Sequence, residues 1–200
     1  MNGNYKIRLA TEADAEGMLA IYTSIVLETA ISFELDPPSV DEFQSRIRST
    51  LTRTPWLVCE IDGEVAGYAY AGSLRTRAAY QWSVEVTVYV NANYRRLGVG
   101  SAVYTSLFNC LRFQGYWNAY AAITLPNAGS VGLHEGMGFF RIGTYYNVGY
   151  KFGTWHDVGW WQSELGLLPQ EPVTPVLLPN MRDTDEFQER ISTGLASLRL

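Results

Sequence analysis

The segment Trp82–Val90 and the loop after it constrain the fold more than any other part of the 200-residue chain. Its valines alternate with Glu85, Thr87 and Tyr89, which predicts a strand with one apolar and one polar face. Residues 91–100 form a basic, glycine-bearing loop, and residues 100–113 then carry apolar side chains at helical spacing. The chain therefore contains a strand, a loop and an amphipathic helix in direct succession.

The loop sequence Arg95-Arg96-Leu97-Gly98-Val99-Gly100 has the features of a phosphate-binding turn. A helix N-terminus presents unpaired N–H groups and the positive end of the helix dipole. Glycines let a phosphate approach those donors, and arginines add charge and directional N–H groups. A plain turn with a solvated arginine pair is the alternative interpretation. The loop fits neither a Rossmann fingerprint nor a Walker loop, because the third glycine of the former and the Gly-Lys-Ser/Thr of the latter are missing.

Periodicity, capping boxes and turn residues predict the other elements. The expected strands are 5–9, 56–61, 65–71, 120–124, 139–149 and 155–165, and the expected helices are 11–28, 39–52 and 126–136. This order is typical of an α/β or α+β domain around one mixed sheet. Four prolines follow within 167–180, so we expect a domain over 1–165 and, over 166–200, an extended arm with a short helix from Asp183 to about Leu198.

Composition limits the possible partners and the compartment. The net charge is −5, which argues against nucleic acid or an anionic membrane as the main partner. The segment Met1–Lys6 has no hydrophobic signal core, and no apolar run approaches the ~18 residues of a membrane span, so we expect a cytoplasmic protein. Cys59 and Cys110 lie in apolar segments and are expected to be buried thiols, and we expect no metal site.

The ordered motifs resemble the GNAT acetyltransferase superfamily. Arg95-x-x-Gly98-x-Gly100 is similar to its acyl-CoA loop, and the segment from Asn127 to Gly138-Phe139 is similar to the motif that follows. The chain resembles the phosphinothricin N-acetyltransferase family more closely, together with bacterial relatives acting on methionine sulfone and sulfoximine. The resemblance covers roughly 7–165 and includes the segments Pro55–Val58, Asp62–Gly67, Tyr68–Gly72, Thr87–Val90, Leu125–Asn127 and Trp155–Gly159.

This resemblance implies a GNAT fold, with a splayed mixed central sheet flanked by helices and with acetyl-CoA as cosubstrate. The strands 82–90 and 120–124 should be the parallel pair that diverges. The pantetheine arm would lie against Val88, Tyr89 and Val90, and Asn127 and Ser130 would contact the distal part of the cosubstrate. The residues expected to bind the pyrophosphate are Arg95, Arg96, Leu97, Gly98, Val99, Gly100 and Ser101.

Acetyl transfer to an amine requires a base for the amine and a proton for the departing thiolate. Glu85 lies on the polar face of the central strand beside the expected split, and it matches the candidate catalytic glutamate of the family. His134 stands where most GNAT enzymes carry a tyrosine, and the phosphinothricin group resembles this chain in having histidine there. We expect His134 to act as an acid or a proton relay, and a structural histidine is the alternative.

The acceptor is expected to bind beside the strand 65–71. Arg75, Arg77 and Tyr80 match a family loop thought to hold the acceptor carboxylate, although the family has lysine where Arg75 stands. Phe33 matches a family aromatic near the acceptor. A solvated basic loop and simple loop packing are the alternatives for these positions.

The resemblance therefore implies an N-acetyltransferase that moves the acetyl group of acetyl-CoA to a small amino acid or analogue in a ternary complex. We also expect a homodimer, with the arm from Leu167 wrapping a partner. The alternatives are acetylation of a polyamine or a protein N-terminus, and a non-catalytic acetyl-CoA sensor. Arg75 and Arg77 favour an acidic acceptor over a polyamine.

Overall fold

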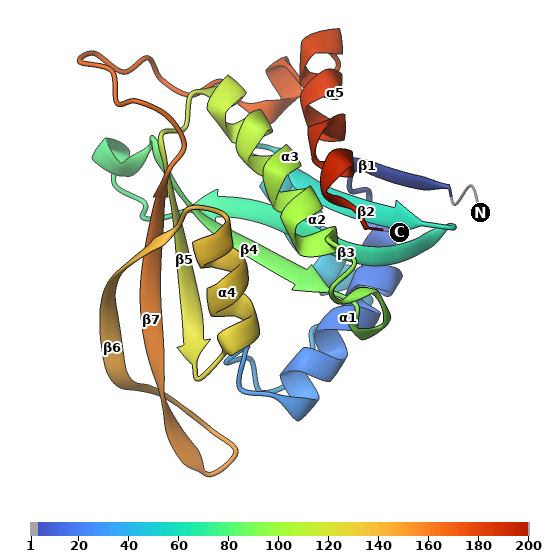
Figure 1. The fold of residues 1–200 in the computed structure, drawn as a ribbon, viewed down its shortest axis with the longest axis vertical. Helices are drawn as coiled ribbons and strands as arrows, with labels where there is room; N and C mark the ends of the chain where they lie inside the picture. The colour runs from blue at the N-terminus through green and yellow to red at the C-terminus, as the bar shows by residue number, and fades with distance from the viewer. Residues whose placement is uncertain (1–3, 200) are drawn as a thin grey trace.

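One seven-stranded sheet runs through the computed structural model, which describes residues 4–199 (Figure 1). The strand order is β1-β2-β3-β4-β5-β7-β6, and all neighbours are antiparallel except β4 and β5. The predicted parallel pair is thus confirmed. The strand bounds are β1 Tyr5–Leu9, β2 Trp56–Ile61, β3 Glu64–Ser73, β4 Ser83–Val90, β5 Asn118–Leu125, β6 Phe140–Lys151 and β7 Thr154–Glu164.

Helices cover both faces of this sheet. The helices are α1 Ala15–Glu28, α2 Val40–Leu51, α3 Val99–Gln114, α4 Ala128–Gly136 and α5 Asp185–Ser192. Side chains of β2 alternate between two cores: Trp56 and Val58 pack with α1 and α2, whereas Leu57 and Cys59 pack with α3 and α5. Figure 1 shows α3 crossing in front of the central strands. The predicted α+β architecture around one mixed sheet is confirmed.

The helix starts follow the capping chemistry in the sequence. The Ser39 side chain accepts a hydrogen bond of 3.2 Å from the backbone N–H of Glu42 at the start of α2. Thr11 and Asp14 form the other capping box, but they open a 3₁₀ turn over Glu12–Asp14, and α1 begins only at Ala15. The observed helix α1 therefore starts about one turn later than predicted.

The segment after Glu164 packs on its own chain. Leu178 and Phe187 are fully buried in the core that α3 shares with the sheet. The last helix, expected to reach about Leu198, ends at Ser192 and continues as a 3₁₀ turn over Thr193–Ser197. The expected arm is thus folded back on its own chain from Val173 onward, where the carbonyl oxygen of Val173 accepts a hydrogen bond of 2.8 Å from the indole N–H of Trp82. Residues 1–3 and 200, which belong to the two predicted segments, lie outside the described residues.

The structure also bears on the two cysteines and on membrane-spanning helices. Cys59 and Cys110 are buried free thiols, and burial raises the pKa of Cys59 to about 11 and that of Cys110 to about 12. Within residues 4–199, no helix has the length and apolarity needed to cross a bilayer.

Candidate active site

The central sheet opens between β4 and β5. The two strands pair only from Ser83 to Glu85 on β4, with Asn118 to Tyr120 on β5. Beyond Glu85, β4 keeps its partner β3 on one side, and on the other side no strand within residues 4–199 pairs with it. Glu85 is therefore the last paired residue before the strands diverge, and the backbone of Val86–Val90 borders the gap.

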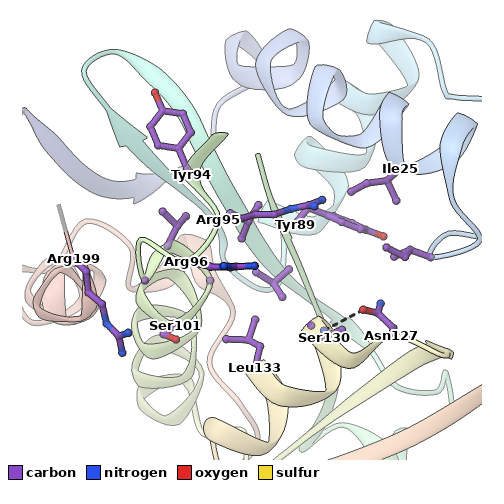
Figure 2. A pocket seen from close by; sticks show the side chains of 17 residues that line it. Ile25, Tyr89, Tyr94, Arg95, Arg96, Ser101, Asn127, Ser130, Leu133 and Arg199 are labelled. Atoms are coloured by element: carbon purple, nitrogen blue, oxygen red, sulfur yellow. Dashed lines mark hydrogen bonds between the residues drawn. The ribbon is translucent and has the colours of Figure 1, made fainter. Parts of the chain in front are cut away.

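A cavity of about 650 Å³ lies at this opening (Figure 2). Its walls come from α1, the end of β4, the loop before α3 and the first turns of α3 and α4. The predicted cosubstrate residues around it are Val88, Tyr89, Val90, Arg95, Arg96, Gly98, Val99, Gly100, Ser101, Asn127 and Ser130. The lining residues that sequence reasoning missed are Ile25, Ile31, Tyr94, Gly129, Leu133 and Arg199. Leu97, also predicted, does not line it.

The loop before α3 is shaped by left-handed backbone. Arg96 has φ of 65° and Gly98, the N-cap residue of α3, has φ of 80°. A non-glycine residue in this region is strained, and such strain is common at ligand-binding loops. Because Gly98 has no side chain, it gives no cap to the first N–H groups of the helix. Those groups and the dipole of α3 make this end of the cavity suited to an anion.

The first turn of α4 forms the opposite wall. The side-chain oxygen of Asn127 accepts a hydrogen bond of 3.1 Å from the backbone N–H of Ser130, drawn as a dashed line in Figure 2. This N-cap fixes the two residues that sequence reasoning expected to contact the cosubstrate. On α3, a Cβ built on Gly100 would lie 3.0 Å from the side chain of Leu133, so glycine lets α3 and α4 approach closely.

Glu85 is half-buried at the point of divergence, although it does not line the cavity itself. Burial raises the pKa of its carboxyl group, and the charge of Arg75 opposes that shift. A carboxylate with a raised pKa is a stronger base than an ordinary surface glutamate. Glu85 is therefore not a fully solvated strand glutamate.

His134 lies on the buried side of α4 and is only 3% exposed. Its Nδ1 is 2.8 Å from the carbonyl oxygen of Ser130, and its Nε2 is 3.0 Å from the hydroxyl of Tyr104. Burial lowers the pKa of His134, partly offset by the bond to Ser130. The Ser130 hydroxyl, which belongs to a cavity-lining residue, is 3.3 Å from Nδ1. Ser130 therefore separates His134 from the cavity.

The four residues predicted to bind the acceptor lie in two different parts of the structure. Arg75, Arg77 and Tyr80 lie exposed in the segment after β3, and the Arg75 guanidinium is 5.9 Å from the ring centroid of Trp160. Phe33 comes from the α1–α2 connection and packs on Gly149 of β6, where any Cβ would lie 2.2 Å from the ring. Of these four residues, Arg75 is the one whose charge lowers the pKa of Glu85.

Lys151 holds the segment that carries Phe33, and sequence reasoning missed it. Its Nζ is buried and donates three hydrogen bonds of 2.7, 2.7 and 2.8 Å to the carbonyl oxygens of Val26, Ser32 and Glu34. Burial lowers the pKa of Lys151, and the nearby charge of Glu34 opposes that effect. All three ammonium hydrogens are thus satisfied by the α1–α2 connection. Nothing in the sequence pattern marks this lysine.

The described residues contain no group of three or more His, Cys, Asp or Glu side chains placed to hold a metal ion. His156, which precedes Asp157 in sequence, has its Nε2 3.0 Å from the carbonyl oxygen of Lys151. Its ring centroid is 6.2 Å from that of Phe33, so His156 supports the β6–β7 hairpin and the segment packed on it.

Comparison with known proteins agrees with this geometry. Residues 7–160 match the model of the acetyltransferase (GNAT) domain. The phosphinothricin N-acetyltransferase of Streptomyces viridochromogenes is 43% identical over 172 residues, which cover 86% of this chain and 94% of that protein. The L-methionine sulfoximine/L-methionine sulfone acetyltransferase of Pseudomonas aeruginosa is 37% identical over 164 residues, covering 80% and 94%.

A solved structure has the same fold. The phosphinothricin acetyltransferase (Pat) from Sinorhizobium meliloti, crystallised in complex with AcCoA, superposes with a TM-score of 0.80 at 30% identity, over 90% of this chain and 98% of that one. The N-acetyltransferase from Staphylococcus aureus gives a TM-score of 0.79 at 33% identity, over 82% and 99%. With the domain match over most of its length, the chain belongs to the GNAT family of acetyltransferases.

Proposed function

We propose that the protein transfers the acetyl group of acetyl-CoA to the amino group of a small amino-acid-like molecule. The observation that carries this proposal is the cavity that begins at the N-terminus of α3 and follows β4 along the gap that opens after Glu85. Its anion-binding end suits a pyrophosphate, and the free side of β4 suits an extended amide chain. The named relatives act on phosphinothricin and on methionine sulfoximine or sulfone, which supports an amino-acid-like acceptor.

In this mechanism Glu85 takes a proton from the acceptor ammonium, directly or through water. The free amine attacks the thioester carbonyl carbon, a C–N bond forms and the C–S bond breaks. The proton that the attacking nitrogen then loses balances the one that the departing thiolate takes up, so CoA leaves as the thiol. His134 serves as a relay through Ser130, because Ser130 lines the cavity and lies within 3.3 Å of Nδ1. Arg75, with Arg77 and Tyr80 in the same segment, binds the acceptor carboxylate, and Phe33 packs beside the acceptor.

The test is a thiol-release assay with acetyl-CoA against methionine sulfone, methionine sulfoximine, phosphinothricin, common amino acids, polyamines and short peptides. We expect release with the amino-acid analogues. The variant Glu85→Gln should lose about 10²- to 10⁴-fold in kcat while still binding CoA. Full activity of that variant would refute the base assignment. Release only with polyamines or peptides would refute the acceptor class, and CoA binding with no acceptor turned over would favour a sensor.

We also propose that the protein is a cytoplasmic homodimer. Strand β6 ends the sheet order, and its large exposed apolar side chains are Phe140, Ile142, Tyr145, Tyr146, Val148 and Tyr150. A strand edge of this kind favours pairing with a second copy. The two free thiols suit a reducing compartment. Light scattering should give twice the chain mass, and Ile142→Asp should lower it to one chain; a monomeric native protein would refute the proposal.

A further inference from the structure

The segment after α5 is bound along α3. The hydroxyl of Ser106 donates to the carbonyl oxygen of Ile191 at 2.5 Å and accepts from the backbone N–H of Gly194 at 3.1 Å. The side-chain amide of Asn109 donates to the hydroxyl of Thr193 at 2.8 Å. These bonds fix the direction of the segment, which runs along α3 toward the start of that helix.

Its last described residues rest on the loop that begins the helix. The backbone N–H of Arg199 donates to the carbonyl oxygen of Leu97 at 3.0 Å. The carbonyl oxygen of Ser197 lies so close to Gly98 that a Cβ atom built on Gly98 would be only 2.0 Å from that oxygen. The backbone is therefore held on the outer side of the turn, and the Arg199 side chain is left to project beside the first turn of α3, near Ser101 (Figure 2).

This placement adds a third guanidinium group to the cavity. Arg95, Arg96 and Arg199 all line it, and none of its lining residues is acidic. Within residues 4–199, no carboxylate lies within salt-bridge distance of these three side chains. The chain as a whole carries a net charge of −5, whereas the residues around this end of the cavity carry a positive charge.

We propose that Arg199 binds a phosphate group of the nucleotide part of acetyl-CoA. The inference rests on the proposed function for the identity of the anion. Arg199 lies outside the region 7–160 that matches the GNAT domain, so the domain itself does not supply it. A guanidinium group offers two parallel N–H donors to phosphate oxygens, and the helix N-terminus alone lacks such a mobile donor pair. The ADP portion of CoA carries both a pyrophosphate and a 3′-phosphate, and Arg199 binds one of them.

The test compares dissociation constants for CoA and 3′-dephospho-CoA by titration calorimetry. Arg199→Gln should weaken CoA binding about three- to tenfold, and Arg199→Lys should restore part of that loss. The matched control is Arg182→Gln, which removes the same charge from an exposed residue of the same segment that does not line the cavity. Equal melting temperatures would show that each variant is folded.

The two ligands identify the phosphate. If Arg199→Gln weakens CoA but leaves 3′-dephospho-CoA unchanged, Arg199 binds the 3′-phosphate; if it weakens both, Arg199 binds the pyrophosphate. Unchanged binding of CoA, or an equal loss with Arg182→Gln, overturns the inference. Because no acceptor is present, failure of the native protein to acetylate any acceptor leaves this result intact, whereas failure of the native protein to bind CoA refutes the proposed function itself.

Discussion

The hydroxyl group of Tyr104 on α3 lies 3.0 Å from Nε2 of His134 on α4, at the far side of the ring from Ser130. The carbonyl oxygen of Ser130 can only accept, so Nδ1, 2.8 Å away, must donate. Nε2 is then the acceptor for the tyrosine hydroxyl. His134 is thus held as the neutral Nδ1–H tautomer, with its proton on the side of Ser130 and the cavity.

Removal of the tyrosine hydroxyl should test this arrangement. In Tyr104→Phe, Nε2 becomes a buried acceptor with no donor, so the free energy of unfolding should fall by about 1–2 kcal/mol in urea denaturation. The control is Tyr146→Phe, because Tyr146 is 74% exposed and should change stability by less than about 0.5 kcal/mol. Equal stability of Tyr104→Phe and the native protein would show that the hydrogen bond between Tyr104 and His134 does not stabilise the fold.

The lowered pKa of His134 should make stability depend on pH. The folded protein disfavours the charged ring, whereas the unfolded chain titrates near the ordinary value of about 6.5. The stabilising contribution is therefore complete above that value and is lost as the pH falls below it toward the folded pKa. Urea unfolding at several pH values between about 5 and 8 should show this slope, and His134→Gln should flatten it. A slope unchanged in the variant would assign the effect to other groups.

Arg75 should set the pH at which Glu85 becomes a base. Burial raises the pKa of Glu85 and Arg75 lowers it, so Arg75→Gln removes the opposing effect and raises that pKa further. Activity needs the carboxylate, so the acid limb of the kcat/KM profile should move to higher pH in Arg75→Gln. Arg77→Gln, which removes the same charge two residues away, should weaken acceptor binding without moving that limb. Identical profiles for both variants would exclude the coupling.

Lys151 should determine both stability and acceptor affinity. Lys151→Met leaves the carbonyl oxygens of Val26, Ser32 and Glu34 without their shared donor, which should cost about 1–3 kcal/mol. Because Ser32 and Glu34 flank Phe33, we also expect a higher KM for the acceptor and an unchanged KM for acetyl-CoA. The control is Lys6→Met, which removes the ion pair between the exposed Lys6 and Glu60; Glu60 keeps its partner Arg8, so the change should cost about 0–1 kcal/mol. Equal increases in both KM values would indicate general unfolding.

Gly194→Ala should act on cosubstrate binding from a distance. A Cβ at Gly194 would lie 1.9 Å from the carbonyl oxygen of Ala102, so the segment that carries Arg199 must move away from α3. We expect weaker CoA binding than in the native protein, close to that of Arg199→Gln. Gly132→Ala is the matched control, because its Cβ would meet nothing within 4 Å. Native CoA affinity in Gly194→Ala would show that the segment does not support the site.

The central unit of the fold could be predicted because its signals are local. The alternation of apolar and polar residues placed Glu85 on the polar face of β4. Gly98 and Gly100 marked the start of α3, and the predicted start differs from the observed one by one residue. Eleven of the twelve predicted cosubstrate residues line one cavity, because they belong to the ends of β4, α3 and α4, where the motif itself fixes the geometry. Leu97 is the exception: it packs against the core, and its carbonyl oxygen meets Arg199.

The remaining residues could not be predicted because their partners are distant in sequence. Tyr104 meets His134 across 30 residues, and Lys151 reaches Val26 across 125. No periodicity or capping rule connects such positions. The same holds for the last helix, where charged side chains favoured a helix to about Leu198, but close contact of Gly194 with α3 coincides with a 3₁₀ turn.

The divergence of β4 from β5 gives this sheet a free edge in its interior. Exposed edges elsewhere invite pairing with any extended chain, and proteins usually shield them with charges or bulges. Here the free edge of β4 borders a cavity walled by α1, α3 and α4, so it faces the inside of the molecule rather than its outer rim. Strand β6 at the end of the sheet is open to another chain, whereas the inner edge of β4 opens into that cavity. The sheet thus carries two unlike edges, one placed for a second protein strand and one placed for a small extended ligand.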